Sequence, residues 1–365
     1  MKIALVHDYL IQYGGAERVL EVLCEMFPNA PIYTLFYDRE KIKGKFADHK
    51  IITSFLDTPF VRRHYKWFFL LMPLAAFTLK VDSQYRQIIC CSSSFAKGIR
   101  LPLCTKKILY CYTPIRYAWD NNVLDDGLKS LGMPKVMRFL GSLIWWMLQT
   151  LLQKWDCYFS KKFDVILSVS DFIAQKIEKY YNREAKVLYP PVDLNKFYYD
   201  SSIKREKFFL MAGRLVAYKK FDLVIRVFNE LRLPLKIVGI GPEGKRLRLL
   251  AQSPLIEFVD RVSDEELRKY YSRARAFIFP QEEDFGIVAV EAMACGAPVI
   301  AYGSGGILEI AKPNLNGIFF DQQNLTSLTT AIEQFVDLKW DHDAISQSVA
   351  NFSVENFKKE LLNLL

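Results

Sequence analysis

Four acidic side chains flank one apolar segment near the carboxy end of the sequence. Residues 282–301 read EEDFGIVAVEAMACGAPVIA, with Glu283 in the opening acidic run and Glu291 eight positions later. A helix dipole favours acids at its amino end, so capping would explain the opening run, from Glu282 to Asp284. Capping does not explain Glu291, because a carboxylate among apolar residues needs hydrogen-bonding partners. The vicinal hydroxyls of a sugar or a ribose would supply such partners.

A basic turn follows another predicted strand. Residues 213–220 read GRLVAYKK and come directly after the apolar run at 208–212. Arg214 and Lys219 flank the turn into the next predicted helix, where a guanidinium, an ammonium and backbone N–H groups can converge on a diphosphate. Taken alone, the turn could also be a solvated basic loop.

Three glycine-rich loops occupy comparable places at strand ends. Their glycines allow the backbone to approach a flat or charged ligand closely, although each could be only a tight turn. Ligands of doubly wound sheets bind beyond the carboxyl ends of the strands, so all five loops indicate one site in a cleft between domains. The glycine loops are Gly14–Gly15, GIGPEG at 239–244 (with Gly239 and Gly241) and GSGG at 303–306.

Several other chemistries lack their motifs. No Gly-x-Gly-x-x-Gly follows the first strand and no P-loop is present, which disfavours a dinucleotide site. Asp341-His-Asp343 lies far from any predicted strand end and the other histidines lack ligand spacing, so no metal site is expected. His7, at the end of the first strand, is the one histidine expected near a cleft. The seven cysteines have no metal-like spacing and are typical of reduced thiols in a cytoplasmic protein.

Short apolar runs alternate with helix-period stretches along the chain, which predicts parallel sheets covered by helices. The alternation is interrupted at 190–207 by PPVDLNKFYYDSSIKREK, which indicates a linker. We therefore expect an α/β protein of two doubly wound, Rossmann-like domains: residues 1–192, a linker at 193–206 and residues 207–351. A final helix at about 352–365 is expected to pack back on the first domain.

The elements that frame the candidate loops are predicted from apolar runs and helical spacing. They include strands at 3–6, 208–212, 235–239, 276–279 and 299–302, and helices at 220–231, 264–273 and 287–295.

The chain carries 49 Lys and Arg against 40 Asp and Glu, a net charge of +9. Such a charge favours nucleic acid, an anionic membrane or a phosphorylated ligand. Two segments favour the membrane: RRHYKWFFLLMPLAAFTLK at 62–80 and FLGSLIWWMLQTLLQKW at 139–155 combine basic and aromatic residues with apolar runs too short to span a bilayer. Each would lie in the membrane interface or, alternatively, be a buried helix of its own domain. The opening MKIALVHDYL indicates a first strand and no secretory signal, so we expect a cytoplasmic protein at the inner face of the cytoplasmic membrane.

These motifs resemble those of the retaining glycosyltransferases of family 4, which have the GT-B fold of two Rossmann-like domains. EEDFGIVAVEAMACGAPVIA is similar to that family's Glu-x7-Glu signature, and GRLVAYKK to its Gly-Arg-Leu-x5-Lys region. The amino-terminal half resembles a subgroup, mostly bacterial mannosyltransferases that build surface polysaccharides, through HDYLIQYGGAERVLEVL, SSSFAKG, YTPIRYAWD and VLYPPVD. The resemblance covers nearly the whole chain.

The resemblance implies a role for each matching residue. Glu283 would bind hydroxyls of the donor sugar and Glu291 the ribose, while Arg214 and Lys219 would bind the diphosphate without a metal ion or other cofactor. The further donor-binding positions would be Gly14, Gly15, Gly213, Gly239, Gly241, Asp284, Phe285, Gly286 and Ile287, and the acceptor-side positions Asp8, Arg116 and Asp120.

Tyr112 is where this chain departs from the family, many of whose members carry His at that place in YCYTP. An unperturbed tyrosine, with a pKa of about 10, is a poor general base near neutral pH. Tyrosine in place of histidine matters less for a retaining transfer in which the leaving phosphate takes the acceptor proton. Tyr112 could still orient the sugar by a hydrogen bond, so it stays a catalytic candidate with Glu283, Arg214 and Lys219.

The expected function is the transfer of a sugar to a lipid-linked or oligosaccharide acceptor in surface polysaccharide synthesis, as for O-antigen, capsule or exopolysaccharide. GDP-mannose is the first choice of donor, and a UDP-sugar stays open. A GT-B nucleotide-sugar 2-epimerase is an alternative that would need no acceptor. A nucleic-acid-binding protein is disfavoured, because the sequence has no dense Lys/Arg stripe and no RNA-binding aromatic motif.

Overall fold

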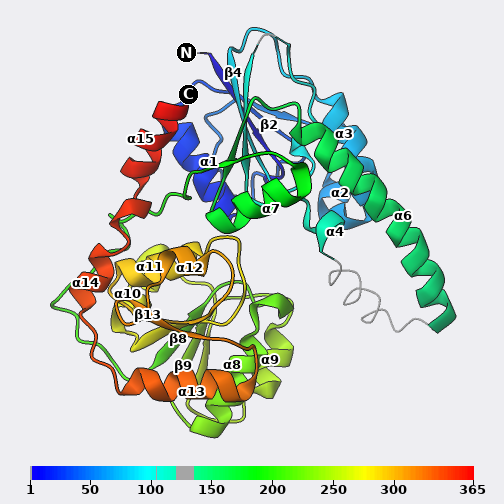
Figure 1. The fold of residues 1–365 in the computed structure, drawn as a ribbon. Coiled ribbons are helices and arrows are strands. Elements are labelled where there is room, and N and C mark those ends of the chain that lie inside the picture. The colour runs from blue at the N-terminus through cyan, green and yellow to red at the C-terminus, as the bar shows by residue number, and fades with distance from the viewer. Residues whose placement is uncertain (1, 104, 121–134) are drawn as a thin grey trace. The chain divides into compact units, whose positions relative to one another are not determined.

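The computed structural model describes residues 2–103, 105–120 and 135–365, and the chain divides into two compact units, Met1–Leu188 and Tyr189–Leu365. Each unit is built on its own parallel sheet with helices packed against it (Figure 1). This confirms the predicted fold class of two doubly wound α/β domains. The predicted packing of the final helix on the first domain stays a prediction.

The sheet of the first unit has the strand order β3-β2-β1-β4-β5-β6-β7, and every pairing is parallel. Its central strands β1 and β4 are buried along their whole length, as expected for a parallel sheet covered by helices on both faces. The strands are β1 (Ile3–His7), β2 (Ile32–Thr34), β3 (Ile51–Thr53), β4 (Gln87–Ser92), β5 (Lys106–Cys111), β6 (Val165–Ser168) and β7 (Lys186–Val187). The helices are α1 (Gly15–Met26), α2 (Pro59–Arg63), α3 (Met72–Thr78), α4 (Arg116–Trp119), α6 (Lys135–Ser160) and α7 (Asp171–Tyr181), with the short 3-10 helices η1 (Tyr65–Leu71) and η2 (Ala96–Gly98).

The sheet of the second unit has the order β10-β9-β8-β11-β12-β13, again with parallel pairings. The strands are β8 (Phe209–Ala212), β9 (Leu235–Val238), β10 (Ile256–Val259), β11 (Ala276–Phe279), β12 (Val299–Tyr302) and β13 (Gly317–Phe320). The helices are α8 (Phe221–Leu231), α9 (Gly244–Leu250), α10 (Asp264–Arg273), α11 (Ile287–Ala294), α12 (Ile307–Ile310), α13 (Leu325–Val336), α14 (His342–Gln347) and α15 (Val354–Leu364), with the 3-10 helices η3 (Ala217–Lys219) and η4 (Ala350–Phe352).

Both sheets reverse their winding direction at the centre. The chain runs outward from β1 to β3 on one side and resumes with β4 on the other, so β1 and β4 are neighbours, and β8 and β11 are neighbours in the same way. Ligands of doubly wound sheets bind at this switch point, beyond the carboxyl ends of the two central strands. The loops that follow β8 and β11 are the basic turn and the acidic segment of the sequence.

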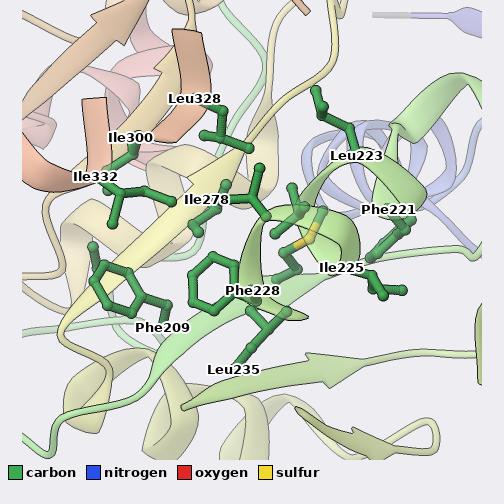
Figure 2. Close-up of a cluster of buried hydrophobic side chains, with 14 of the residues drawn as sticks. Phe209, Phe221, Leu223, Ile225, Phe228, Leu235, Ile278, Ile300, Leu328 and Ile332 are labelled. Atoms are coloured by element: carbon green, nitrogen blue, oxygen red, sulfur yellow. The ribbon is translucent and has the colours of Figure 1, made fainter. Parts of the chain in front are cut away.

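One face of the second sheet is covered by α8 and α13, and their apolar side chains form a continuous core with it. Figure 2 shows Phe209 of β8 and Phe228 of α8 packed together, and their ring centroids are 5.3 Å apart. Ile278 and Ile300 join this core from β11 and β12, and both are buried. The core fixes the central strands, and therefore fixes where their loops begin.

The stretch predicted as a linker is partly packed into the second unit. Phe197 is buried beside the ring of Tyr271, with centroids 5.9 Å apart. The guanidinium of Arg205 donates to the carbonyls of Ala274 and Cys295, both at 2.7 Å. Arg205 thus ties the ends of α10 and α11 together, and burial lowers its pKa to about 10.

The predicted elements around the candidate loops are confirmed to within a residue or two. Helix α10 has the predicted bounds 264–273, and β11 the predicted bounds 276–279. Within the described residues, no helix combines the length and apolar character that crossing a bilayer requires. Six of the seven cysteines are free thiols, and Cys104 lies outside the described residues.

Candidate functional site

The acidic segment and the basic turn meet at the centre of the second sheet. The ammonium of Lys219 lies 3.0 Å from Oε1 of Glu283, and the two side chains are only 11% and 18% exposed. Lys219 ends η3 in the loop after β8, and Glu283 lies in the loop after β11. The adjacency of β8 and β11 therefore brings together two residues that are far apart in the sequence.

The charge of Lys219 is held by its neighbours. Burial by itself would lower the pKa of the ammonium, but Glu283, with a smaller contribution from Glu291, raises that pKa above its ordinary value. Lys219 is therefore a cation at neutral pH in a mostly enclosed place. Such a fixed positive charge can stabilise negative charge that develops on a phosphate.

Gly213 makes room for this ammonium. Its φ of +145° lies in a region that side-chain-bearing residues avoid, and a Cβ built there would lie 3.0 Å from Nζ of Lys219. The glycine that ends β8 therefore lets Lys219 fold back over the backbone. Arg214, the next residue, is exposed.

Gln281 is a site residue that the sequence analysis missed. Its Nε2 donates to Oε1 of Glu283 at 3.1 Å, and the residue is 3% exposed. Lys219 and Gln281 meet the same oxygen of Glu283, so Oε2 keeps its capacity to accept from a ligand hydroxyl. A signal was present, because a polar residue directly after Pro280 at a strand end lies where the site was expected.

The GSGG loop after β12 supports the backbone of the acidic segment. The N–H of Gly306 donates to the carbonyl of Glu283 at 2.9 Å, and a Cβ on Gly305 would lie 2.5 Å from that carbonyl oxygen. Ser304 donates from Oγ to Oε2 of Glu282 at 2.5 Å. These glycines serve close packing between two loops, which holds Glu283 in place.

Glu291 is buried inside α11. It is 1% exposed, and the hydroxyl of Tyr271 donates to its Oε2 at 3.3 Å. The Glu291 carboxylate also affects a neighbouring thiol. Burial is the larger cause and the charge of Glu291 the second cause that raise the pKa of Cys295 to about 12. Tyr271 supplies one of the partners that a carboxylate in this apolar helix needs. The ribose contact expected for Glu291 stays a prediction.

A glycine occupies the N-cap position of the helix that follows the acidic run, and the explanation of the acids by the helix dipole stays open. Helix α11 begins after Gly286, whose φ is +118° and which has no side chain that could cap the helix. Phe285 is buried between the rings of Tyr189 and Phe352, at centroid distances of 5.7 and 5.4 Å. Asp284 and Ile287 are half-buried on either side of this turn. Donor contacts by these residues stay predictions.

Gly239 and Gly241 allow the loops after β8 and β9 to pack against each other. A Cβ on Gly239 would lie 2.0 Å from the carbonyl oxygen of Gly213, and one on Gly241 would lie 2.3 Å from that of Leu215. The close approach at these two glycines is therefore made by the neighbouring loop. Their predicted contact with a donor is a separate question that stays a prediction.

The Gly14–Gly15 turn of the first unit opens α1. The N–H of Gly14 donates to Oε2 of Glu17 at 2.8 Å, and Oε1 of Glu17 lies 3.5 Å from Nε2 of His7. His7 and Glu17 are both buried, and Nδ1 of His7 has no hydrogen-bonding partner among the residues that the structure describes. The end of β1 and the start of α1 are thus joined through Glu17, which the sequence analysis did not single out.

Tyr112 lies beside this turn, with its ring centroid 6.3 Å from that of His7. Its hydroxyl donates to the carbonyl of Ala16 at 3.0 Å. Burial raises the pKa of Tyr112 well above its ordinary value, so the phenolate is even less accessible than in water. Tyr112 can therefore accept a hydrogen bond from a ligand, but it cannot serve as a base near neutral pH.

Asp8 closes the switch point of the first sheet. Its carboxylate accepts from Oγ of Ser92 at 2.9 Å, from N and Oγ of Ser93 at 2.6 and 3.2 Å, and from N of Ala96 at 2.8 Å. Asp8 is 5% exposed, so its hydrogen-bonding capacity is used to join the loop after β1 to the loop after β4. An acceptor contact by Asp8 stays a prediction.

Arg116 and Asp120 lie exposed at the two ends of the short helix α4. A buried carboxylate supports that helix, because Asp156 of α6 accepts from N of Ile115 at 3.1 Å and from Nε1 of Trp119 at 2.9 Å. Its other oxygen lies 2.6 Å from the buried ammonium of Lys97. This group positions the segment that carries the predicted acceptor-side residues.

The part of the chain that the structure describes contains no group of three His, Cys, Asp or Glu side chains that could hold a metal ion. Asp341, in the only Asp-x-Asp of the sequence, caps α14 by accepting from N of Asp343 and N of Ala344, both at 3.1 Å.

Residues 199–351 match the family model described as "Glycosyl transferases group 1". An uncharacterized glycosyltransferase of Methanocaldococcus jannaschii is 28% identical over 184 residues, 49% of this chain and 52% of the relative. A GDP-mannose-dependent alpha-(1-6)-phosphatidylinositol monomannoside mannosyltransferase of Mycolicibacterium smegmatis is 30% identical over 198 residues, 46% of this chain and 52% of the relative. The chain thus spans about half the length of the curated relatives it matches.

Solved structures are similar over the whole chain. HepE of Anabaena, solved in complex with UDP, is similar with a TM-score of 0.72 at 15% identity, covering 100% of this chain and 99% of that one. Sucrose-phosphate synthase of Thermosynechococcus elongatus has a TM-score of 0.72 at 16% identity, covering 99% and 98%. The fold is therefore GT-B, and the match to the glycosyltransferase group 1 model covers residues 199–351 of the second unit.

Proposed function

We propose that this chain, which has a GT-B fold and matches the glycosyltransferase group 1 model over residues 199–351, is a retaining glycosyltransferase that uses a nucleotide-sugar donor. The observation that carries the proposal is the Lys219–Glu283 pair at the switch point of the second sheet, 3.0 Å from Nζ to Oε1. One side chain can bind a diphosphate, and the other can accept from sugar hydroxyls. This is the pairing that a sugar nucleotide requires.

In the proposed reaction, the bond from the anomeric carbon of the sugar to the β-phosphate oxygen breaks and a bond to the acceptor oxygen forms on the same face. The leaving phosphate takes the acceptor proton, so no side chain has to serve as base. Lys219, with Arg214, would neutralise the charge that grows on the β-phosphate, and no metal ion is required in this scheme. Glu283 would orient the sugar and favour its cationic transition state.

For the donor and acceptor we propose mannose from GDP-mannose and a lipid-linked or oligosaccharide acceptor of a surface polysaccharide. A GDP-mannose-dependent mannosyltransferase among the relatives supports this donor. A UDP-sugar is the second candidate, because the similar HepE structure contains UDP. A lipid-linked acceptor would place the enzyme in the cytoplasm, at the inner face of the cytoplasmic membrane.

Thermal-shift measurements with GDP, UDP, ADP and their sugars test the donor. A ligand at 100 times its dissociation constant stabilises the folded state by about 2.7 kcal/mol, which is readily measured. We expect stabilisation by GDP and GDP-mannose, and stabilisation by UDP alone would transfer the proposal to a UDP-sugar. Stabilisation by none of them would contradict the proposed function.

Product analysis separates the remaining alternatives. A transferase forms its glycoside only when an acceptor is present, whereas a 2-epimerase changes the sugar nucleotide without one. A nucleic-acid-binding protein would instead retain nucleic acid on a filter with a steep dependence on salt.

A further inference from the structure

Two segments of the first unit expose large apolar side chains. In α2, η1 and α3 these side chains are Phe60, Trp67, Leu70, Leu71, Leu74 and Phe77, and in α6 they are Trp146, Met147, Leu151 and Tyr158. Trp67 is 76% exposed, more than an apolar side chain of its size usually is. We call these ten residues the apolar face.

Helix α6 is apolar on two sides. Leu152 and Phe159 are buried toward the unit, while Met147, Leu151 and Tyr158 recur at helical spacing on the exposed side. A helix that only covers its own core exposes polar residues on its outer side. The outer side of α6 therefore has an apolar surface that its own unit does not cover.

The two segments are neighbours in the first unit. The ring of Phe95 contacts Phe69 of η1 at a centroid distance of 5.1 Å and Trp155 of α6 at 5.4 Å. A Cβ on Gly98 would meet both Trp155 of α6 and Ala76 of α3. Both segments thus pack around η2, and α2, α3 and α6 lie on the same side of the first sheet (Figure 1).

The exposed charged side chains that the structure describes on these two segments are cations. Residues 59–81 contain Lys and Arg but no Asp or Glu, and Arg63 and Lys66 are exposed there. On α6, Lys154 is exposed, whereas Asp156 is buried on Lys97. An apolar surface with aromatic residues and exposed cations is complementary to the headgroup region of an anionic bilayer.

We infer that the apolar face docks the protein on an anionic lipid bilayer. This inference rests on the proposed function, because the bilayer is where a lipid-linked acceptor is presented. Trp67, Leu70 and Leu74 enter the interface, and Arg63, Lys66 and Lys154 contact the headgroups. A second copy of the chain fits less well, because a two-fold contact would bring cations of the same surface toward one another.

Vesicle flotation tests the docking, with vesicles of phosphatidylcholine alone and of phosphatidylcholine with phosphatidylglycerol. The full chain should float with the anionic vesicles and be released by salt. The affinity of the triple variant W67S/L70S/L74S for the anionic vesicles should fall by roughly tenfold or more, because the variant removes the apolar contact. Each cation near an anionic surface contributes about fivefold, so R63Q/K66Q/K154Q should bind on the order of 100-fold more weakly.

The matched control replaces three exposed leucines of the second unit, L249S/L255S/L362S, where Leu249 is 78% exposed. It should bind vesicles as the unchanged protein does. Equal binding by W67S/L70S/L74S and the control would overturn the inference. The inference would also be overturned if neither the unchanged protein nor W67S/L70S/L74S bound vesicles, while the unchanged protein self-associated and the variant did not.

Nucleotide binding, measured by thermal shift without vesicles, distinguishes failure of docking from failure of the proposed function. All variants should keep the nucleotide shift, since none of the exchanged residues lies at the Lys219–Glu283 pair. A nucleotide shift without vesicle binding would overturn the docking alone. Vesicle binding without any nucleotide shift would contradict the proposed function and support the docking.

Discussion

At the scale of single residues, the candidate site depends on a half-enclosed ion pair. Removing one partner of such a pair leaves the other charge in a poorly hydrated place. In the structure Glu283 compensates Lys219, and Gln281 donates a hydrogen bond to the same carboxylate oxygen of Glu283. A ligand diphosphate would provide a second anion for the same ammonium.

Replacing Lys219 by Met should lower kcat without unfolding the protein. The exchange removes the cation proposed to face the leaving phosphate, and the loss of one such group typically costs about 100- to 1,000-fold in kcat. Steady-state kinetics with the donor identified by thermal shift give the measurement. The control is Lys269→Met, because Lys269 is exposed on α10 and forms an ion pair with Glu265 at the surface. Equal kcat values for the two variants would remove Lys219 from the mechanism.

At the scale of elements, the loops after β8, β9, β11 and β12 support one another through glycines. The second unit also depends on hydrogen bonds at the ends of its helices. Arg205 donates to the carbonyl of Cys295, and His342 donates to the carbonyl of Gly296. Substitutions at these glycines or helix ends should therefore change the stability of the second unit, whereas substitutions at the Lys219–Glu283 pair should change catalysis.

Gly239→Ala should destabilise the second unit. The new Cβ would lie 2.0 Å from the carbonyl oxygen of Gly213, and the φ of +144° is unfavourable for alanine. Conformations of this kind cost about 1–3 kcal/mol for residues other than glycine, and the overlap adds to that cost. Urea unfolding measures the change. Gly303→Ala is the control, because its nearest neighbours lie 3.6 Å away and it should be close to neutral.

Acidification should weaken the docking of α14. Nδ1 of His342 donates to the carbonyl of Gly296 at 2.8 Å, and burial, followed by the nearby Arg205, lowers the pKa of His342 below 6.5. The unfolded chain then binds a proton more readily than the folded one, so stability is complete above about pH 6.5 and is lost as the pH falls through the folded pKa. The charge of Asp341 raises the pKa of His342 but does not cancel the lowering by burial and Arg205.

The measurement is urea unfolding between neutral and mildly acidic pH. His342→Gln keeps a donor for Gly296 and should flatten the dependence on pH. An unchanged slope in this variant would assign the dependence to other groups.

At the scale of the whole molecule, the chain consists of two units that each have a sheet and a core of their own. The Lys219–Glu283 pair belongs to the second unit alone, and the apolar face belongs to the first. Nucleotide binding and membrane docking can therefore be affected separately by substitution.

Calorimetry of the full chain should show this division. A nucleoside diphosphate should raise the temperature of the transition that corresponds to the second unit, by mass action on its folded state. The variant F228A should lower that same transition, since truncating a buried phenylalanine costs about 3–5 kcal/mol. A ligand that shifts only the other transition would place the nucleotide site in the first unit.

Much of the second unit could be predicted from local sequence. The bounds of α10 and β11 follow from apolar spacing with polar and proline residues at the ends. Short strands such as β2, β3 and β13 were not predicted, because three or four apolar residues carry too little local signal. Gln281, Glu17 and the Lys97–Asp156 pair were not singled out either, since their partners are set by packing.

By itself, the sequence determined where the charged and glycine-rich loops lie, because charge, glycine and apolar spacing are local properties. Only the tertiary structure decided that the loop of Lys219 lies against the loop of Glu283, since this depends on β8 pairing with β11. It also decided that the outer side of α6 is uncovered, which an apolar run cannot reveal. The physical reason is the same in both cases: strand order and helix packing minimise the exposed apolar surface of the whole unit, and no single segment contains that information.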